Sequence, residues 1–199
     1  MDFTIRVHGA LAGNLKGREM EDIVSRFSKE YDRLLNRYID QRTNLAEVKE
    51  IQHEAEELIS QIEGSLSTCD DVYKLPLVTS IWTCLKFAAT CARRTGALDE
   101  SVNLYRAAMV HFPEIETRVS LVLVLCESKR WAEACLLLNS IDDDLVINRM
   151  PEAAAELLGW ICSETVLACG VSERVLRLCV LTVNPRSPVK IVLSGVKEE

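Results

Sequence analysis

The stretch from Lys86 to Pro113 constrains the fold of this chain more than any other segment. Small side chains follow one another at Ala88, Ala89 and Ala92, and a glycine stands at position 96. Small side chains let two helices approach closely, glycine permits a sharp reversal, and the final proline ends a helix. The order of these residues therefore predicts two short helices packed against each other, with Gly96 between them.

The composition excludes some classes of protein. With 199 residues and 48% hydrophobic side chains, the chain can form one compact domain or a short helical array. Its net charge of −7 argues against general nucleic-acid binding. The longest apolar run, residues 119–126, is too short to span a bilayer, and the first residues lack the pattern of a secretory signal. We therefore expect no membrane span and no direct contact with nucleic acid.

The cysteines indicate a reducing compartment. No two of them form a CxxC pair, and the chain has only three histidines, so a zinc framework is not supported. Most lie among aliphatic residues at helical spacing, which predicts reduced and buried thiols and a cytoplasmic or nuclear location. The eight are Cys69, Cys84, Cys91, Cys126, Cys135, Cys162, Cys169 and Cys179.

The segments before residue 75 have different patterns. Residues 1–17 combine an apolar–polar alternation with several glycines, which predicts a short strand or a flexible start. Residues 18–66 show an apolar spacing of three and four. This spacing fits either one long coiled-coil helix or an antiparallel hairpin, and the polar segment before Asn44 and Glu47 favours the hairpin. Residues 64–74 are interpreted as a loop, with Pro76 in the first turn of the next helix.

The region 75–182 is predicted to be helical throughout. Its expected helices run from Pro76 to the residues before Gly96, from about Asp99, over 114–128, over 130–139, from Pro151 to Gly170 and over 172–182. The apolar run 119–126 could also form a buried strand, but its place between helical pairs favours a helix. Residues 183–199 form a tail, in which 188–193 could form a second short strand that pairs with the first.

Residues 85–113 resemble one tetratricopeptide repeat. The positions that carry the resemblance are Leu85, Ala88, Ala89, Ala92, Gly96, Tyr105, Ala108 and Pro113, with Ser101 in place of the usual alanine. A weaker copy follows about 34 residues later. It has Leu121, Val122 and Leu125 in its first helix and residues 129–134 at its turn, but it lacks the turn glycine and the closing proline. Residues 151–182 could be a third pair.

The resemblance implies a solenoid of helical pairs whose first helices line a groove that binds another protein. The groove positions in this chain are Lys86, Thr90, Arg93, Ser120, Leu123 and Glu127. One subtype of the family grips the C-terminal carboxylates of chaperones with Lys, Asn and Arg. Lys86 matches one basic position, but Thr90 and Ser120 stand where asparagines are expected, so the resemblance does not imply chaperone binding.

No motif for catalysis or cofactor binding appears. The sequence has no GxxxxGK[ST], HExxH, GxSxG or EF-hand pattern, and we expect no catalytic residue, no metal and no cofactor. Trp82 and Trp131 lie on apolar stripes and are expected in the core, whereas Trp160 is a candidate contact residue. In the tail, Val189–Leu193 with the acidic end resembles a SUMO-interacting strand, which would add to the edge of a partner's sheet.

These observations predict an all-α protein, a TPR-like antiparallel helical-pair solenoid with an N-terminal helical hairpin. The expected function is a non-catalytic adaptor or subunit of a multiprotein complex. The alternative is a structural protein that self-associates, as a homodimer for example, through the apolar seam of residues 20–66.

Overall fold

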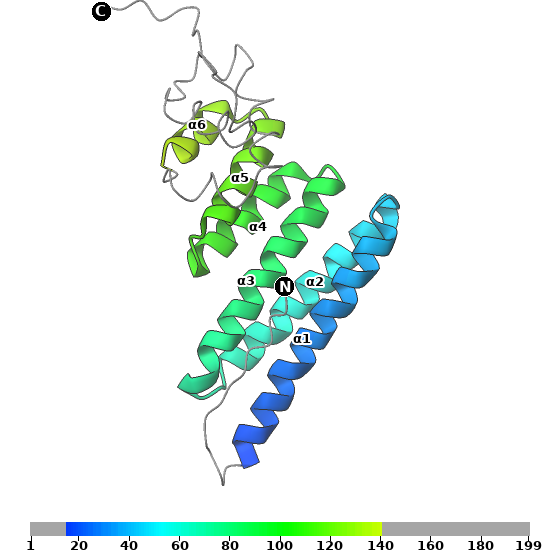
Figure 1. The fold of residues 1–199 in the computed structure, drawn as a ribbon, viewed down its shortest axis with the longest axis vertical. Coiled ribbons are helices and arrows are strands. Elements are labelled where there is room, and N and C mark those ends of the chain that lie inside the picture. Colours follow the sequence, from blue (N-terminus) through cyan, green and yellow to red (C-terminus); the bar gives the residue numbers. More distant parts are fainter. Residues whose placement is uncertain (1–14, 141–199) are drawn as a thin grey trace, which may run out of the picture.

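The computed structural model describes residues 15–140, and over this range the protein is all-α (Figure 1). Of the described residues 86% are helical and none lies in a strand, which confirms the predicted fold class. The first 14 residues, where a short strand or flexible start was expected, lie outside the described residues, as do the possible strand at 188–193, the third pair at 151–182, Trp160 and the SUMO-like tail. The helices are α1 (Leu15–Gln41), α2 (Leu45–Leu66), α3 (Asp71–Arg94), α4 (Leu98–His111), α5 (Ile115–Glu127) and α6 (Trp131–Asn139).

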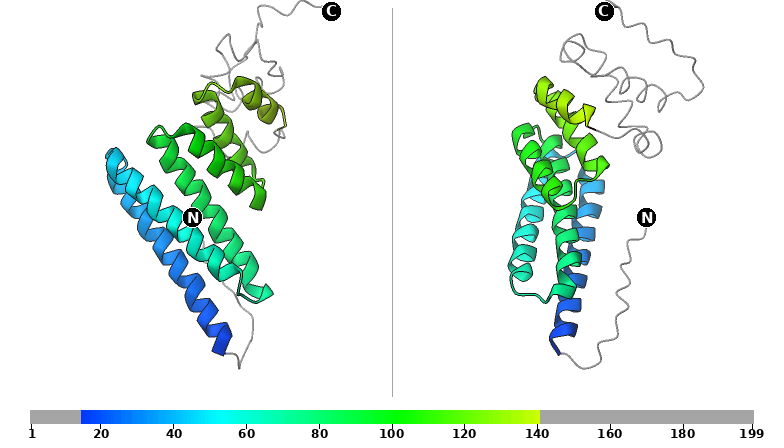
Figure 2. Two further views of the ribbon diagram at one scale, coloured as in Figure 1. Left: turned by 180° about the vertical axis from the view of Figure 1, so that it is seen from behind. Right: turned by 90° about the vertical axis from the view of Figure 1, so that its left-hand side faces the viewer.

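Residues 18–66 form two helices rather than one. Helix α1 ends at Gln41, the chain reverses, and α2 returns alongside it (Figures 1 and 2). The side chain of Asn44 accepts a hydrogen bond from the backbone N–H of Glu47 at 3.4 Å, as an N-cap residue does. Arg37 on α1 pairs with Glu47 and Glu54 on α2. The hairpin reading is therefore the right one, and its two helices are joined by ion pairs as well as by apolar contacts.

The predicted loop over 64–74 is too long. Helix α2 continues through Gly64 to Leu66, and α3 already begins at Asp71. Hydroxyl groups at this end donate hydrogen bonds to nearby carbonyls. For example, Ser67 Oγ donates to the carbonyl of Gly64 at 2.7 Å. Pro76 lies inside α3, beyond its first turn. A proline there cannot donate to the carbonyl four residues earlier, that of Val72, a residue that is itself exposed to solvent.

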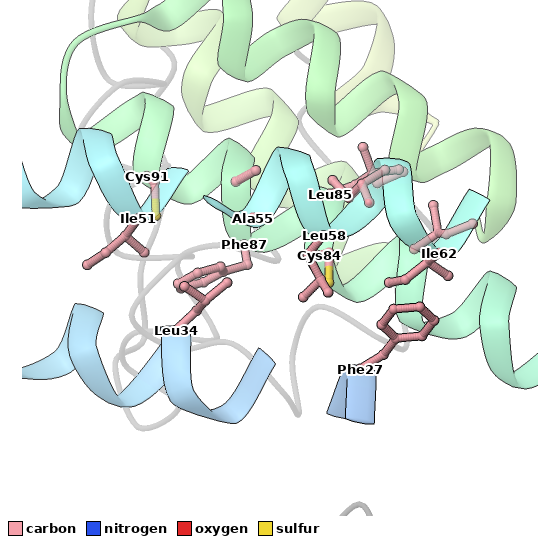
Figure 3. Close-up of a cluster of buried hydrophobic side chains, with 14 of the residues drawn as sticks. Phe27, Leu34, Ile51, Ala55, Leu58, Ile62, Cys84, Leu85, Phe87 and Cys91 are labelled. Atoms are coloured by element: carbon pink, nitrogen blue, oxygen red, sulfur yellow. The ribbon is translucent and has the colours of Figure 1, made fainter. Parts of the chain in front are cut away.

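Two apolar clusters form the core. The hairpin core joins α1, α2 and α3, and its largest fully buried members are Phe27, Leu34, Ile51, Ile62, Leu77 and Ile81 (Figure 3). The repeat core joins α4, α5 and α6, with Val102, Val119, Val122 and Leu125 among its members. The two clusters meet where Ala89 of α3 joins the repeat core and Ala108 of α4 joins the hairpin core.

The turns after α3 and α5 have the same backbone pattern. At the first, the N–H of Gly96 bonds to the carbonyl of Arg93 and the N–H of Ala97 to that of Ala92, at 3.1 and 2.9 Å. At the second, the N–H of Lys129 bonds to Cys126 and that of Arg130 to Leu125, at 3.0 and 2.8 Å. This is the pattern by which a left-handed residue closes a helix. Gly96 has a φ of 82° and Lys129 a φ of 60°.

Helix α3 is central among the described helices. It packs against α2 on one side and α4 on the other, and it also contacts α1. By length and composition alone α3 could cross a membrane, although half of the apolar segment is buried inside the protein. The central helix of a helical bundle has the same properties, because it is covered by apolar neighbours on several sides.

Candidate partner-binding face

Polar side chains from α3 and α5 meet along one seam. Lys86, Thr90 and Arg93 follow one another on α3 at the spacing that places residues on one side of a helix. Glu116, Ser120 and Glu127 on α5 lie opposite, as the contacts below show. We call these six residues the α3–α5 face. Its side chains are neither fully buried nor fully exposed, except that Glu116 is more open to solvent.

Arg93 and Glu127 pair with each other. The Nε of Arg93 donates to one carboxylate oxygen at 3.0 Å and an Nη to the other at 2.7 Å, with each side chain 24% exposed. Such a two-pronged contact holds both groups in a fixed orientation. Arg93 and Glu127, both predicted to contact a partner, therefore join α3 to α5 within this chain.

Lys86 lies over an aromatic ring. Its Nζ is 3.9 Å from the centre of the Trp82 ring and 3.9 Å from a carboxylate oxygen of Glu116. Burial lowers the pKa of the ammonium group, against the opposing effect of Glu116 and Glu114. Trp82 packs edge-on against Phe112, with ring centres 5.6 Å apart. The indole of Trp82 is partly buried, and its N–H finds no hydrogen-bond acceptor among the described residues.

Tyr105 of α4 contacts Thr90, which lies in the middle of the face. Its hydroxyl lies 3.1 Å from Oγ1 of Thr90, which also donates to the carbonyl of Lys86 at 2.9 Å. Burial raises the pKa of Tyr105, while hydrogen bonds with Thr90 and Ser120 lower it. In the sequence, Tyr105 was only one of the positions that carry the resemblance to a tetratricopeptide repeat, and its contacts with two predicted groove residues on different helices were not foreseen.

Leu123 does not belong to this face. It is only 3% exposed and is a member of the repeat core. The reason is that α5 is buried almost all round, with each of the residues 121–126 in the core. The prediction of Leu123 as an accessible groove residue is therefore corrected, whereas the other five positions do reach the α3–α5 face.

The described cysteines are free thiols, and four of the five are buried. Burial raises the pKa values of Cys84, Cys91 and Cys126 to about 12. A thiol must ionise to act as a nucleophile, so these three are unreactive near neutral pH. Within residues 15–140, no group of three His, Cys, Asp or Glu side chains converges as a metal site would require.

No protein-family model, curated protein or solved structure matches the chain. The geometry of the α3–α5 face is therefore the basis for the function proposed below.

Proposed function

We propose that this protein is a non-catalytic adaptor, or a subunit of a multiprotein complex, that binds another protein through the α3–α5 face. The observation that carries the proposal is the contact of Lys86 on this face with the neighbouring ring of Trp82, which packs on Phe112. A partly buried tryptophan is typical of residues that dominate protein interfaces, and this one lies beside an ammonium group that has lost part of its hydration.

A TPR-like arrangement of helical pairs is part of this proposal. The pairs α3–α4 and α5–α6 follow each other, and each reverses at a turn with the same two backbone hydrogen bonds. These features support a short solenoid in which α3 and α5 are the first helices of two successive pairs. In such a stack, first helices present their exposed sides to the same surface, where a partner's peptide or helix can bind.

The arrangement does not favour self-association through residues 20–66. Phe27, Leu34 and Ile62 of that seam are at most 2% exposed, because they pack against one another and against α3 (Figure 3). A substitution such as Leu34→Asp would place a charge in the core of the monomer and would unfold it. A homodimer would therefore need a different surface from the seam that suggested it. The free, buried cysteines support a cytoplasmic or nuclear location for the proposed adaptor.

The test is affinity purification of the full chain from its native cells, followed by measurement of the complex mass by light scattering. We expect a heteromeric complex of fixed stoichiometry. Lys86→Glu should release the partner, because it reverses the charge over the Trp82 ring. Arg93→Glu is less suitable, since it would break the two-pronged pair with Glu127 at 2.7 Å, whereas Lys86 is farther from Glu116, at 3.9 Å.

The matched control is Lys29→Glu, which makes the same change at an exposed position of α1. It should leave the complex intact. Retention of the partner by both variants would show that the α3–α5 face is not the binding surface. A bare monomer or homodimer from native cells would refute the adaptor proposal itself.

A further inference from the structure

The end of the hairpin where α1 turns into α2 carries two adjacent arginines. Arg42 lies in the turn and Arg94 is the last residue of α3, far away in sequence. The Nε of Arg94 donates to the backbone carbonyl of Arg42 at 3.2 Å, which brings the two residues together. Ile39 and Leu45, on either side of the turn, are 55% and 53% exposed. We call these four residues the arginine tip.

No carboxylate of the described residues pairs with the two arginines of the tip. Most other arginines of the described helices pair with glutamates, as Arg33, Arg37 and Arg106 do. By contrast, Arg42 and Arg94 have no carboxylate partner within residues 15–140.

The electrostatic surroundings of Tyr38 agree with the contact between Arg94 and Arg42. Burial raises the pKa of the Tyr38 hydroxyl, and the positive charges of Arg94, Arg42 and Arg93 all lower it. Three arginines therefore act on one phenol at this end of the molecule.

A structural role explains only part of this arrangement. A cation near a helix C-terminus is favourable. The Nε of Arg94 donates to the carbonyl of Arg42, just beyond the end of α1. That contact leaves the remaining N–H groups of Arg94 and the whole guanidinium of Arg42 available. It also does not explain why two large aliphatic side chains are exposed at the same turn.

We propose that the arginine tip binds an acidic segment of a partner protein that also carries aliphatic side chains. The partner's carboxylates would accept hydrogen bonds from Arg42 and Arg94, and its aliphatic side chains would cover Ile39 and Leu45. Guanidinium groups suit this role because their N–H groups form a fixed fork that matches a carboxylate. This surface is separate from the α3–α5 face, and its occupation does not depend on that face.

A short acidic peptide fits better than a long polyanion. Glu47, Glu50 and Glu54 lie along the adjacent side of the hairpin, and the chain carries a net charge of −7. A nucleic-acid backbone or an anionic bilayer would extend over these carboxylates and be repelled. A peptide can contact the tip alone.

The experiment is a titration of the full chain with a fluorescein-labelled peptide of alternating glutamate and leucine, followed by fluorescence anisotropy. Arg42→Gln combined with Arg94→Gln should weaken binding about tenfold or more, because two charge-assisted contacts are lost. Ile39→Ser combined with Leu45→Ser should weaken binding of this peptide but not of polyglutamate. The control, Arg18→Gln with Arg26→Gln, removes the same charge at exposed positions near the start of α1 and should change the affinity less than about twofold.

A second measurement does not depend on the variants. The peptide should slow amide hydrogen exchange at the turn between α1 and α2 in the unchanged protein, and a lysine–leucine peptide should not. The proposal would be overturned if the variant with Arg42→Gln and Arg94→Gln bound the acidic peptide as tightly as the control variant. It would also be overturned if the peptide slowed hydrogen exchange elsewhere than at this turn. Binding of RNA or of phosphatidylserine vesicles at the tip in preference to the acidic peptide would overturn it as well.

Discussion

Ser101 shows how one small side chain joins two helices. It is fully buried, and its hydroxyl donates to the carbonyl of Ala89 on α3 at 2.7 Å. The facing residues Ala88, Ala89 and Ala92 are fully buried as well. Small side chains on both helices let α3 and α4 approach, and the serine adds a hydrogen bond that the alanine of the resembling repeat could not make. Substitution by alanine therefore tests the bond without changing the packing much.

We expect Ser101→Ala to lower the free energy of unfolding by about 1 kcal/mol, the usual contribution of a buried hydrogen bond. Ser101→Leu should lower it by about 2 kcal/mol or more, because the extra atoms force the two helices apart. Urea denaturation followed by circular dichroism measures both. Ser60→Ala serves as the control, since that hydroxyl is exposed and bonds only within its own helix. An equal effect of Ser101→Ala and Ser60→Ala would mean that the bond to Ala89 contributes nothing.

At the scale of elements, the turns after α3 and α5 have the same backbone geometry but different residues. Both need a residue with positive φ to close the helix, and this is Gly96 at the first turn and Lys129 at the second. A side chain in that conformation is strained by contact between Cβ and the backbone. Apart from Gly96 itself and its two neighbours in the chain, no residue has an atom within 4 Å of the place where a Cβ would sit on Gly96, so the effect of a substitution there comes from the local backbone alone.

We predict opposite effects at the two turns. Gly96→Ala should lower the free energy of unfolding by about 1 kcal/mol, and Lys129→Gly should raise it by about 0.5 kcal/mol. The gain is the smaller of the two because the φ of 60° at Lys129 lies inside the small left-handed region open to L-residues, whereas the 82° of Gly96 lies outside it. Thermal and urea unfolding of the two variants beside the parent protein measure the difference. If Lys129→Gly were destabilising, the second turn would not be the equivalent of the first.

At the scale of the whole molecule, burial is distributed unevenly along the chain. Helix α3 has buried residues over its length from Tyr73 to Ala92 and is covered by α1, α2 and α4. The longer helix α1 buries only Phe27 and Leu34 fully. Because α3 belongs to both cores, it cannot open unless both are disrupted.

Amide hydrogen exchange should follow this difference. We expect the slowest exchange in the second half of α3, around residues 84–92, and faster exchange in α1 and α6, which pack against fewer of the described helices. Mass spectrometry of peptic fragments gives the rates. Slower exchange in α1 than in α3 would show that the hairpin, and not α3, is the stable centre of the molecule.

Local signals in the sequence determined the helical class and much of the helix order. These signals act over a few neighbouring residues, so they predict helix starts and ends without knowledge of the fold. They are the small residues before Gly96, the pair of Asn44 and Glu47, and Pro113. The resemblance to a tetratricopeptide repeat, rather than a local signal, implied that Lys86, Thr90 and Arg93 share one side of a helix. The loop predicted at 64–74 was too long, because α2 and α3 both extend into this region and only residues 67–70 connect them.

Only the tertiary structure decided which residues meet. It buried Leu123 and paired Arg93 with Glu127. It also placed Tyr105 between Thr90 and Ser120 and brought Arg94 to Arg42. Each of these contacts joins different helices. The apolar seam of α1 and α2, which the sequence left open as a possible dimer contact, is buried against α3. Residues distant in the chain come together through the packing of whole helices, which depends on shape and burial over the full core and leaves no mark in any short stretch of sequence.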